Sequence, residues 1–360
     1  MSLRFSFDAN IARAATIPSR LYVDPLYLEL ERDRVFGRTW QMAARTEQLR
    51  QTGDFVATLI AGEPIVVVRD GESLRAFHNI CLHRAGPVAE GCGRRKTLQC
   101  RYHGWTYDLR GGLLRAPEME GVEEFSPDDM HLLPVQVAVW GPLVFVNLDP
   151  KAPPLSHYLE DIPQRAERFN AGAMRYVMRK EWELACNWKV YVDNYLEGYH
   201  VPVVHPGLHK ELDYGGYRVE TFRYYSRQHA PLRPVRSGDA TRQYSAASPD
   251  DEPQYYWLFP NVMLNVYMGQ MQTNVVEPLG HDRTRVTFEW FALAPPDNAA
   301  TDPAWSRMVA FSDEIQLEDV EICEAVQRNL RSRVYDRGRY SAKRENGVHH
   351  FHSLLHEFLT

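Results

Sequence analysis

Two short pairs of metal-binding residue types constrain the fold of this chain more than any other feature. They lie in the stretch CLHRAGPVAEGCGRRKTLQCRYHGW, where a C-x-H pair, Cys81 and His83, is followed after 16 residues by a C-x-x-H pair, Cys100 and His103. Each pair is short enough to sit at the tip of one hairpin. Two β loops could therefore hold one metal centre from opposite sides, which predicts a small β domain here.

Two thiolates and two imidazoles suit two kinds of metal centre. Zinc binds Cys₂His₂ sets, and so does a [2Fe–2S] cluster in which histidines replace cysteines on one iron. Zinc sites of this composition usually group C-x-x-C with H-x₃₋₅-H, whereas each pair here mixes Cys with His. Mixed pairs favour the cluster, because each loop can then supply both irons. Cys92 fits neither pair, and we interpret it as a free loop thiol.

The charge balance argues against nucleic-acid binding. The chain has 41 Lys and Arg against 47 Asp and Glu, a net charge of −6, whereas nucleic-acid binders usually carry a basic face. The first residues lack the apolar core of a signal peptide, and no segment reaches the roughly 18 unbroken apolar residues of a membrane span. We therefore expect a cytoplasmic protein with no membrane partner, whose five cysteines serve as metal ligands and buried thiols rather than disulfides.

The first half of the chain predicts an antiparallel β domain. At 360 residues, two domains are expected. From Asp54 to about Pro150, short segments of alternating polarity are separated by the turn pairs Asp70-Gly71 and Gly111-Gly112, as hairpins require. A polar, proline-bearing passage, DPKAPPLSHYLED, then predicts a domain boundary.

The second half predicts a mixed domain. A helix near Trp188–Tyr199, strands from Tyr217 to about Leu293 and a helix from about Pro303 to Leu330 give the whole chain an α+β fold class. A further helix is expected at Pro25–Thr39, before the β domain. The expected limits are an N-terminal helical segment at 1–40, the β domain at 41–152 and the mixed domain at 153–360.

A second group of chemically active residues lies in CNWKVYVDNYLEGYHVPVVHPGL. A helix from Asn187 to about Tyr199 would place Asp193, Glu197 and His200 within about 60° of one another on one edge. The proline after His200 would end the helix and let His205 return to the same point. Two imidazoles and one carboxylate, with open positions left over, form the facial triad of non-haem iron(II) oxygenases.

The third ligand is expected on the late helix. At 100° per residue its apolar residues form one stripe, and Asp319 falls inside that stripe, with Glu318 at its edge and Glu321 pointing away. The stripe consists of Met308, Phe311, Ile315, Ile322, Val326 and Leu330. A carboxylate on a buried face is costly unless it is paired or metal-bound. Asp319 is therefore the predicted ligand, and an ion pair with an arginine is the alternative.

Both groups together resemble the catalytic α subunits of Rieske non-haem iron oxygenases over nearly the whole chain. The segment CRYHGWTYDLRGG is similar to the second cluster loop of Rieske domains. The family motif D/E-x-x-H-x₄-H is matched by Glu197, His200 and His205, and the distal aspartate by Asp319. The resemblance implies a Rieske β domain, with its [2Fe–2S] cluster, and a helix-grip catalytic domain that holds mononuclear Fe(II) and uses O₂.

The family also implies an assembly and an electron path. Its members are typically homotrimers in which the cluster of one subunit lies near the iron of the next. Carried over, Glu197 would bridge His103 of one subunit and His200 of its neighbour, with Asp193 as support. NAD(P)H electrons would enter through a separate reductase or ferredoxin. Arg94, Arg95 and Lys96 lie between the cluster ligands, so they are a candidate docking patch for an acidic redox partner, with a solvated loop tip as the alternative.

For the substrate, the sequence favours a small organic molecule. NWKVYVDNYLEGYHVP and WLFPNVMLNVY are similar to stretches in choline-, glycine betaine- and carnitine-type monooxygenases, which implies oxidation of an N-methyl or neighbouring carbon of a quaternary ammonium compound. An aromatic box could bind such a cation or a flat ring, so ring hydroxylation is the alternative. The expected aromatic residues of the cleft are Tyr214, Tyr217, Phe222, Tyr224 and Tyr225, followed by those of the stretch YYWLFPNVMLNVYMGQMQTNVVEPLG. The alternative is that these side chains belong to the core, as aromatic residues on strands usually do.

Two functions of other classes have to be compared with this one. A zinc protein would need only the four residues of the two Cys/His pairs, and it would leave Asp319 without a purpose inside an apolar stripe. A non-catalytic electron carrier could end near Pro150. The remaining residues and the second metal motif argue against both.

Overall fold

The computed structural model describes residues 5–233 and 252–360, which form two compact units. One is Phe36–His157, and the other combines Met1–Val35 with Tyr158–Thr360. The N-terminal helical segment therefore packs with the second unit, a question that the sequence left open. The predicted α+β class is confirmed, because both large sheets are antiparallel and most helices belong to the second unit.

An antiparallel sheet forms most of the Phe36–His157 unit, in the strand order β1-β10-β9-β4-β3-β2-β5. A small sheet of order β6-β7-β8 flanks the second Cys/His pair. The strands are β1 (Gln41–Arg45), β2 (Asp54–Ile60), β3 (Glu63–Asp70), β4 (Ser73–His78), β5 (Cys92–Arg94), β6 (Leu98–Gln99), β7 (Thr106–Tyr107), β8 (Leu113–Arg115), β9 (Pro134–Trp140) and β10 (Leu143–Asn147). The two predicted hairpins are confirmed as β3–β4 and β7–β8.

The central strand β3 divides this unit into two cores. Successive side chains of a strand point to opposite faces, and in the run IVVV all four are fully buried. Val66 and Val68 pack in the core that contains Cys81 and Cys100. Ile65 and Val67 pack in the opposite core. This double burial explains why the segment is continuously apolar rather than alternating.

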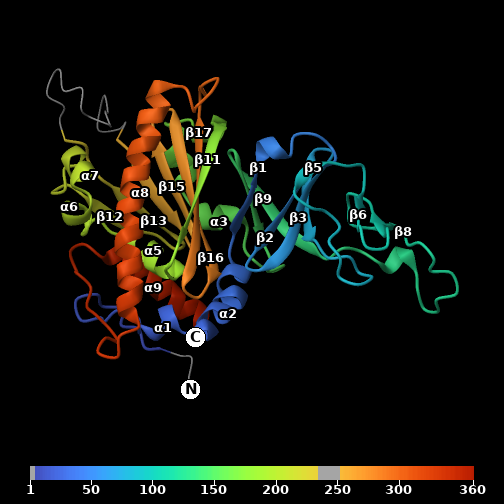
Figure 1. Ribbon diagram of the computed structural model, residues 1–360, viewed down its shortest axis with the longest axis horizontal. Helices are drawn as coiled ribbons and strands as arrows, with labels where there is room; N and C mark the ends of the chain where they lie inside the picture. Colours follow the sequence, from blue (N-terminus) through green and yellow to red (C-terminus); the bar gives the residue numbers. More distant parts are fainter. Residues whose placement is uncertain (1–4, 234–251) are drawn as a thin grey trace. The chain divides into compact units, whose positions relative to one another are not determined.

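The second unit is built on a seven-stranded antiparallel sheet of order β11-β17-β16-β15-β14-β13-β12. Its strands are β11 (Arg175–Leu184), β12 (Arg218–Thr221), β13 (Tyr225–His229), β14 (Gln254–Leu258), β15 (Val262–Tyr267), β16 (Gln270–Gly280) and β17 (Arg283–Ala292). In Figure 1 the long helix α8 (Pro303–Leu330) runs along these strands, and α5 (Trp188–Tyr195) contacts both α8 and β16. This arrangement places the residues of α5 and α8 beside the sheet.

The remaining helices are short, apart from the C-terminal one. They are α1 (Arg20–Val23), α2 (Pro25–Arg34), α3 (Leu155–Leu159), α4 (Ile162–Glu167), α6 (Val201–Val204), α7 (Pro206–Glu211) and α9 (Asn346–Leu359), with 3₁₀ turns η1 (Phe36–Arg38), η2 (Thr46–Gln48), η3 (Pro127–Asp129) and η4 (Ala171–Ala173). Among the described residues, none of the helices has the length and apolar character needed to cross a membrane.

Helix α8 has the predicted limits but a different buried face. Asp302 caps its start by accepting hydrogen bonds from the amides of Ala304 and Trp305. The predicted stripe is wrong at Ile322 and Val326, which are 36% and 41% exposed. The buried residues are Trp305, Val309, Gln316, Cys323, Gln327 and Leu330. The two glutamines can be buried because their amides are hydrogen-bonded, to the Tyr191 hydroxyl and to the Asn187 amide.

The helix predicted at Asn187–Tyr199 is too long, because α5 ends at Tyr195. The reason is a carboxylate: Glu197 accepts hydrogen bonds from the amides of Tyr199 and His200, which a continuing helix would donate to its own carbonyls. Pro202 does not end this helix. It lies in the first turn of α6, where a missing amide hydrogen costs nothing.

A buried ion pair joins the N-terminal segment to the start of α5. Lys189 and Glu31 are both fully buried, and Lys189 Nζ lies 2.6 Å from Glu31 Oε1. The Trp188 indole donates to the other carboxylate oxygen at 2.7 Å. Burial raises the pKa of Glu31 and lowers that of Lys189, and the attraction between the two groups opposes both shifts. The segment therefore fixes the helix that precedes the metal-binding turn.

Replacing Lys189 with Met would leave the Glu31 carboxylate buried without its partner. We expect K189M to lower the free energy of unfolding of this unit by about 3–5 kcal/mol in urea denaturation. The matched control is K180M, which breaks the half-exposed pair of Lys180 with Asp313 and should cost about 1 kcal/mol or less. Equal losses in the two variants would contradict a special role for the buried pair.

Candidate metal centres

The two loops that carry the Cys/His pairs share one backbone design. In each loop the amide of the cysteine donates to the carbonyl five residues later, and the amide four residues later donates back to the cysteine carbonyl, at 2.8 to 3.0 Å. The residue at this fourth position, Ala85 or Gly104, has a positive φ, of 57° or 75°. Cys81 and Cys100 are thus presented by equivalent turns, and both lie in the same core cluster.

The two cysteines and the two histidines of these loops differ in burial. Cys81 and Cys100 are each 2% exposed, whereas His83 and His103 are exposed, with ring centroids 4.6 Å apart. His83 also stacks on Trp105, at 5.1 Å. Buried sulfurs beside paired surface imidazoles fit a [2Fe–2S] cluster with one iron on each kind of ligand. A single tetrahedral zinc would need no such separation.

Tyr107 supports the first sulfur of this group. The amide of Leu82 donates to the Tyr107 oxygen at 3.0 Å, so the phenol hydrogen is free to point at Cys81 Sγ, 3.4 Å away. Burial raises the pKa of Tyr107 well above its usual value, which keeps the phenol a donor. Burial also raises the pKa of the Cys100 thiol. Metal binding must therefore displace a proton from Cys100.

The other candidate residues of this stretch are Cys92 and the basic cluster, and they are exposed or contact neighbouring side chains. Cys92 has a free, exposed thiol, but it lies in strand β5 rather than in a loop. Arg94 pairs with Asp54 at 2.6 Å, and the Arg95 guanidinium lies over the Phe55 ring. Two cations of the predicted docking patch are thus partly used within the unit, and the patch stays a prediction.

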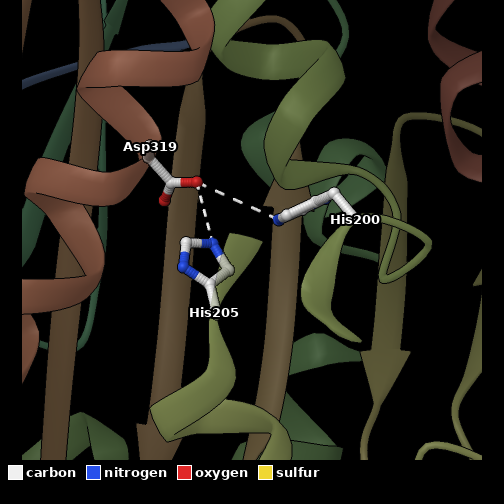
Figure 2. A group of neighbouring side chains, drawn as sticks. All are labelled: His200, His205 and Asp319. Atoms are coloured by element: carbon white, nitrogen blue, oxygen red, sulfur yellow. Dashed lines mark hydrogen bonds and ion pairs between the residues drawn. The ribbon is translucent and has the colours of Figure 1, made fainter. Parts of the chain in front are cut away.

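The second group converges on Asp319, as Figure 2 shows. His205 Nε2 lies 3.0 Å from Asp319 Oδ1, and His200 Nε2 lies 3.9 Å from the same oxygen. Among the described residues, these three are the group whose ligand atoms all lie within 4.8 Å of one another. Asn194 donates to Asp319 Oδ1 at 2.5 Å and thereby holds the carboxylate. Two imidazole nitrogens and one carboxylate fit the facial triad of iron(II).

A carboxylate orients each imidazole from its outer nitrogen. His200 Nδ1 lies 2.6 Å from Glu197 Oε1, and His205 Nδ1 lies 2.7 Å from Glu318 Oε2. Carboxylate–histidine pairs of this kind fix the ring and raise the basicity of the nitrogen that binds a metal. Burial alone would lower the pKa of His205, but Asp319 and Glu318 together raise it above its ordinary value. The site therefore stabilises positive charge at the centre of the triad.

Asp193 does not join this group. Its carboxylate accepts a hydrogen bond from the Tyr22 hydroxyl at 2.6 Å and lies 2.9 Å from His352 Nε2. It lines a second cavity of about 210 Å³, together with Glu197, His352 and Glu345. Burial, followed by the charges of Glu197 and Asp193, raises the pKa of Glu345. Glu197 lines this cavity and the one beside the triad, so it lies between the two.

A cavity of about 140 Å³ lies beside the triad. Its walls include Glu197 and the three triad residues. The aromatic side chains in its lining are Tyr191, Tyr195, Tyr217, Tyr255, Tyr267 and Phe288. A concave site with aromatic walls and a few polar groups is the usual form of a small-molecule site.

Aromatic residues from both stretches predicted for this cleft line it. Tyr217 of the first stretch does so, and its ring lies so close to Gly198 that a Cβ there would be 2.6 Å from it. Tyr255 and Tyr267 of the second stretch line the cavity as well.

The other four residues named in the first stretch are not in the lining. Phe222 instead stacks on Tyr225, and Tyr224 stacks on Tyr158. The prediction was wrong for these four because the register of this irregular segment, and with it the face that each side chain occupies, could not be read from the sequence.

Sequence reasoning also missed the residues that hold the ligands in place. Glu318 was placed only at the edge of a stripe, and Asn194 was not considered. Their positions in the sequence could have indicated both residues, because Glu318 is adjacent to the predicted ligand Asp319 and Asn194 lies in the last turn of α5. Only the packing of α5 and α6 on α8 shows that Asn194 meets Asp319 and that Glu318 meets His205.

Fold and sites together define an oxidoreductase that combines an iron–sulfur domain with a mononuclear iron domain. The Rieske [2Fe-2S] domain family matches residues 39–126, and the ring hydroxylating alpha subunit (catalytic domain) family matches residues 171–360. The chain therefore belongs to the Rieske non-haem iron oxygenases. This membership excludes the zinc-protein and pure electron-carrier alternatives.

Relatives of the chain match nearly its whole length. The chloroplastic choline monooxygenase of Arabidopsis thaliana is 38% identical over 369 residues, which cover 98% of this chain and 85% of the relative. The carnitine monooxygenase oxygenase subunit of Escherichia coli (strain K12) is 32% identical, with 97% and 95% covered.

Solved structures agree with these relatives. The quaternary ammonium Rieske monooxygenase CntA in complex with L-carnitine superimposes with a TM-score of 0.86 at 26% identity, over all of both chains. Naphthalene 1,2-dioxygenase from Rhodococcus sp. shares the fold, with a TM-score of 0.77 at 20% identity over 96% of this chain and 94% of that one.

Gly86 tests the geometry of the cluster loops. A Cβ at Gly86 would lie 2.7 Å from Cys100 Sγ, closer than the two atoms can approach. We expect G86A to reduce the visible absorption and the reduced-state EPR signal of the cluster severely. The matched control is G93A in β5, whose Cβ would meet the Phe55 ring at an ordinary 3.5 Å. A full cluster content in G86A would show that the loops can shift without losing the metal.

Proposed function

We propose that this chain is the terminal oxygenase of a Rieske system and that it oxidises a small quaternary ammonium compound. One observation supports the substrate class most directly: the cavity beside the triad combines a wall of tyrosines with the carboxylates of Glu197 and Asp319. Aromatic faces and negative charge both attract a cation that cannot donate hydrogen bonds. The named substrates of the relatives, choline and carnitine, carry such a cation.

The residues of the two metal centres follow from their geometry. Cys81, His83, Cys100 and His103 would hold the [2Fe–2S] cluster, and His200, His205 and Asp319 would hold iron(II). Iron in a facial triad keeps open positions at which O₂ is activated. A monooxygenation puts one oxygen atom into the substrate and releases the other as water, consuming two protons and two electrons. A separate reductase or ferredoxin would deliver the electrons from NAD(P)H.

The chain's own side chains prepare this centre. Glu197 and Glu318 hold the two imidazoles so that both Nε2 atoms face Asp319. Asn194 keeps Asp319 Oδ1 directed at the same point. The tyrosine walls would contact the substrate beside the triad. These side chains would therefore hold the metal ligands and the substrate in position before the reaction begins.

Glu197 would also connect the two kinds of metal centre within a homotrimer. The imidazole of His103 is exposed, so it can reach a neighbouring subunit. The Glu197 carboxylate holds His200 through one oxygen and lines the second cavity as well. A carboxylate between two metal-bound imidazoles couples them. Asp193 would support this bridge by holding Tyr22 and His352 at the wall of the same cavity.

Other parts of the prediction rest on the sequence alone. The domain limits 1–40, 41–152 and 153–360 stay a prediction. So does the cytoplasmic location, since the plant relatives are chloroplastic. Ring hydroxylation is the second candidate function, because a cavity walled by six aromatic rings could also accept a flat ring.

Product analysis separates the two candidate functions. The purified protein, reduced chemically and then exposed to ¹⁸O₂, is expected to convert choline or carnitine into products that carry one labelled oxygen, or into the aldehydes derived from them. Mass spectrometry of a single turnover needs no reductase. Hydroxylation of naphthalene or indole, with no quaternary ammonium compound oxidised, would favour the second candidate.

Glu197→Gln tests the bridge. The amide keeps the size of the side chain but removes its charge, so we expect both metals to stay bound while turnover falls severely. Iron content and the cluster spectrum measure the first part, and product formation measures the second. Glu321→Gln, on the exposed side of α8, is the control and should match the unaltered protein. Near-normal turnover in E197Q would refute the electron-transfer role.

A further inference from the structure

Apart from its two histidines, the charged side chains in the described lining of the triad cavity are acidic. They are Glu197 and Asp319, and within 5–233 and 252–360 the cavity is lined by neither lysine nor arginine. Apart from the iron that the triad would hold, a bound carboxylate would therefore find no cationic side chain in this lining, and leaving water without such a partner is costly. Away from the metal, the cavity suits the ammonium end of a substrate better than an anionic end.

Neutral amides supply the polar surface instead. Six lining residues carry a side-chain amide: Asn194 on α5, Gln228 on β13, Asn265 on β15, Gln272 and Asn274 on β16, and Gln316 on α8. They can donate and accept hydrogen bonds, so each can satisfy a hydroxyl group.

Gln316 has a buried amide nitrogen without a protein partner. It is 1% exposed, its Oε1 accepts a hydrogen bond from the Tyr191 hydroxyl at 2.6 Å, and its Nε2 has no protein partner. A buried amide nitrogen without a partner is rare and costly. Gln316 lies one helical turn before Asp319, and both residues line the cavity. A substrate oxygen close to the triad would satisfy this donor.

The ammonium end has a separate location on the tyrosines. Tyr195, Tyr217 and Tyr255 all line the cavity and lie close enough to influence one another's ionisation. Burial, and then the neighbouring phenols, raise the pKa of Tyr195 well above its usual value, so its ring stays neutral. The Tyr195 hydroxyl donates to Asn265 Oδ1 at 2.7 Å, which fixes the ring next to the amides.

From this arrangement we infer that the substrate is a quaternary ammonium alcohol, with an uncharged, hydroxyl-bearing tail, and that carboxylate-bearing analogues are discriminated against. The inference rests on the proposed function and narrows it. The tyrosines bind the ammonium group, Gln316 binds the tail oxygen, and the described lining offers a carboxylate neither lysine nor arginine.

Calorimetric binding to the oxidised holoenzyme tests this inference without turnover. The probes are choline, glycine betaine, L-carnitine and 3,3-dimethylbutan-1-ol, the last being an uncharged analogue of choline. We expect choline to bind at least about tenfold more tightly than either carboxylate, since leaving a buried charge unpaired costs well over a factor of ten.

The outcomes separate the inference from the proposed function. If a carboxylate binds as tightly as choline and both bind better than the uncharged analogue, the inference is overturned and the proposed function stands. If the uncharged analogue binds as tightly as choline, the ammonium group is not recognised and both fail. Preference for choline over all three supports both.

Two variants test the residues. Gln316→Met should weaken choline binding several-fold while leaving tetramethylammonium, which has no hydroxyl, unchanged; equal weakening of both ligands would refute the role of the amide. Gln272→Lys adds a cation to the lining and should shift preference towards glycine betaine. Gln270→Lys, on the same strand but outside the lining, is the matched control and should leave the preference unaltered. An equal shift in both lysine variants would refute the charge argument.

Discussion

The second unit depends on one carboxylate, that of Asp319, placed where a charge is costly. Its Oδ1 atom accepts a hydrogen bond from Asn194, lies 3.0 Å from His205 Nε2 and faces His200. These partners come from the end of α5, from the residue after α6 and from the N-terminus of α6. Because a half-buried carboxylate is stable only with such partners or a metal, these segments must converge on α8.

The same convergence creates the cavity and its selectivity. Turning the chain at Glu197 ends α5 early, which frees this carboxylate to hold His200 and to line both cavities. It also brings Tyr195 and Tyr217 to the wall beside the triad. Glu197 and Asp319 therefore belong both to the metal site and to the wall of the cavity beside it.

How far the sequence could be read depended on the range of the interaction involved. The helix Pro303–Leu330 was predicted with its limits, because a capping Asp302 and an apolar period are local signals. The inward position of Asp319 followed from that period. The stripe itself failed at Ile322 and Val326, because hydrogen bonds from other elements let Gln316 and Gln327 take the buried places. Local periodicity carries no information about such partners.

The sequence by itself determined the chemistry: two mixed Cys/His pairs, a pair of histidines with a preceding carboxylate, and an inward aspartate define which metals this chain can hold. Residue type and short spacing are sufficient for that, since ligand identity is a local property. Tertiary structure decided what only distant contacts can decide: that Glu318 and Asn194 hold the triad, that Asp193 belongs to a different cavity, and that tyrosines and amides rather than basic residues face the described part of the substrate site.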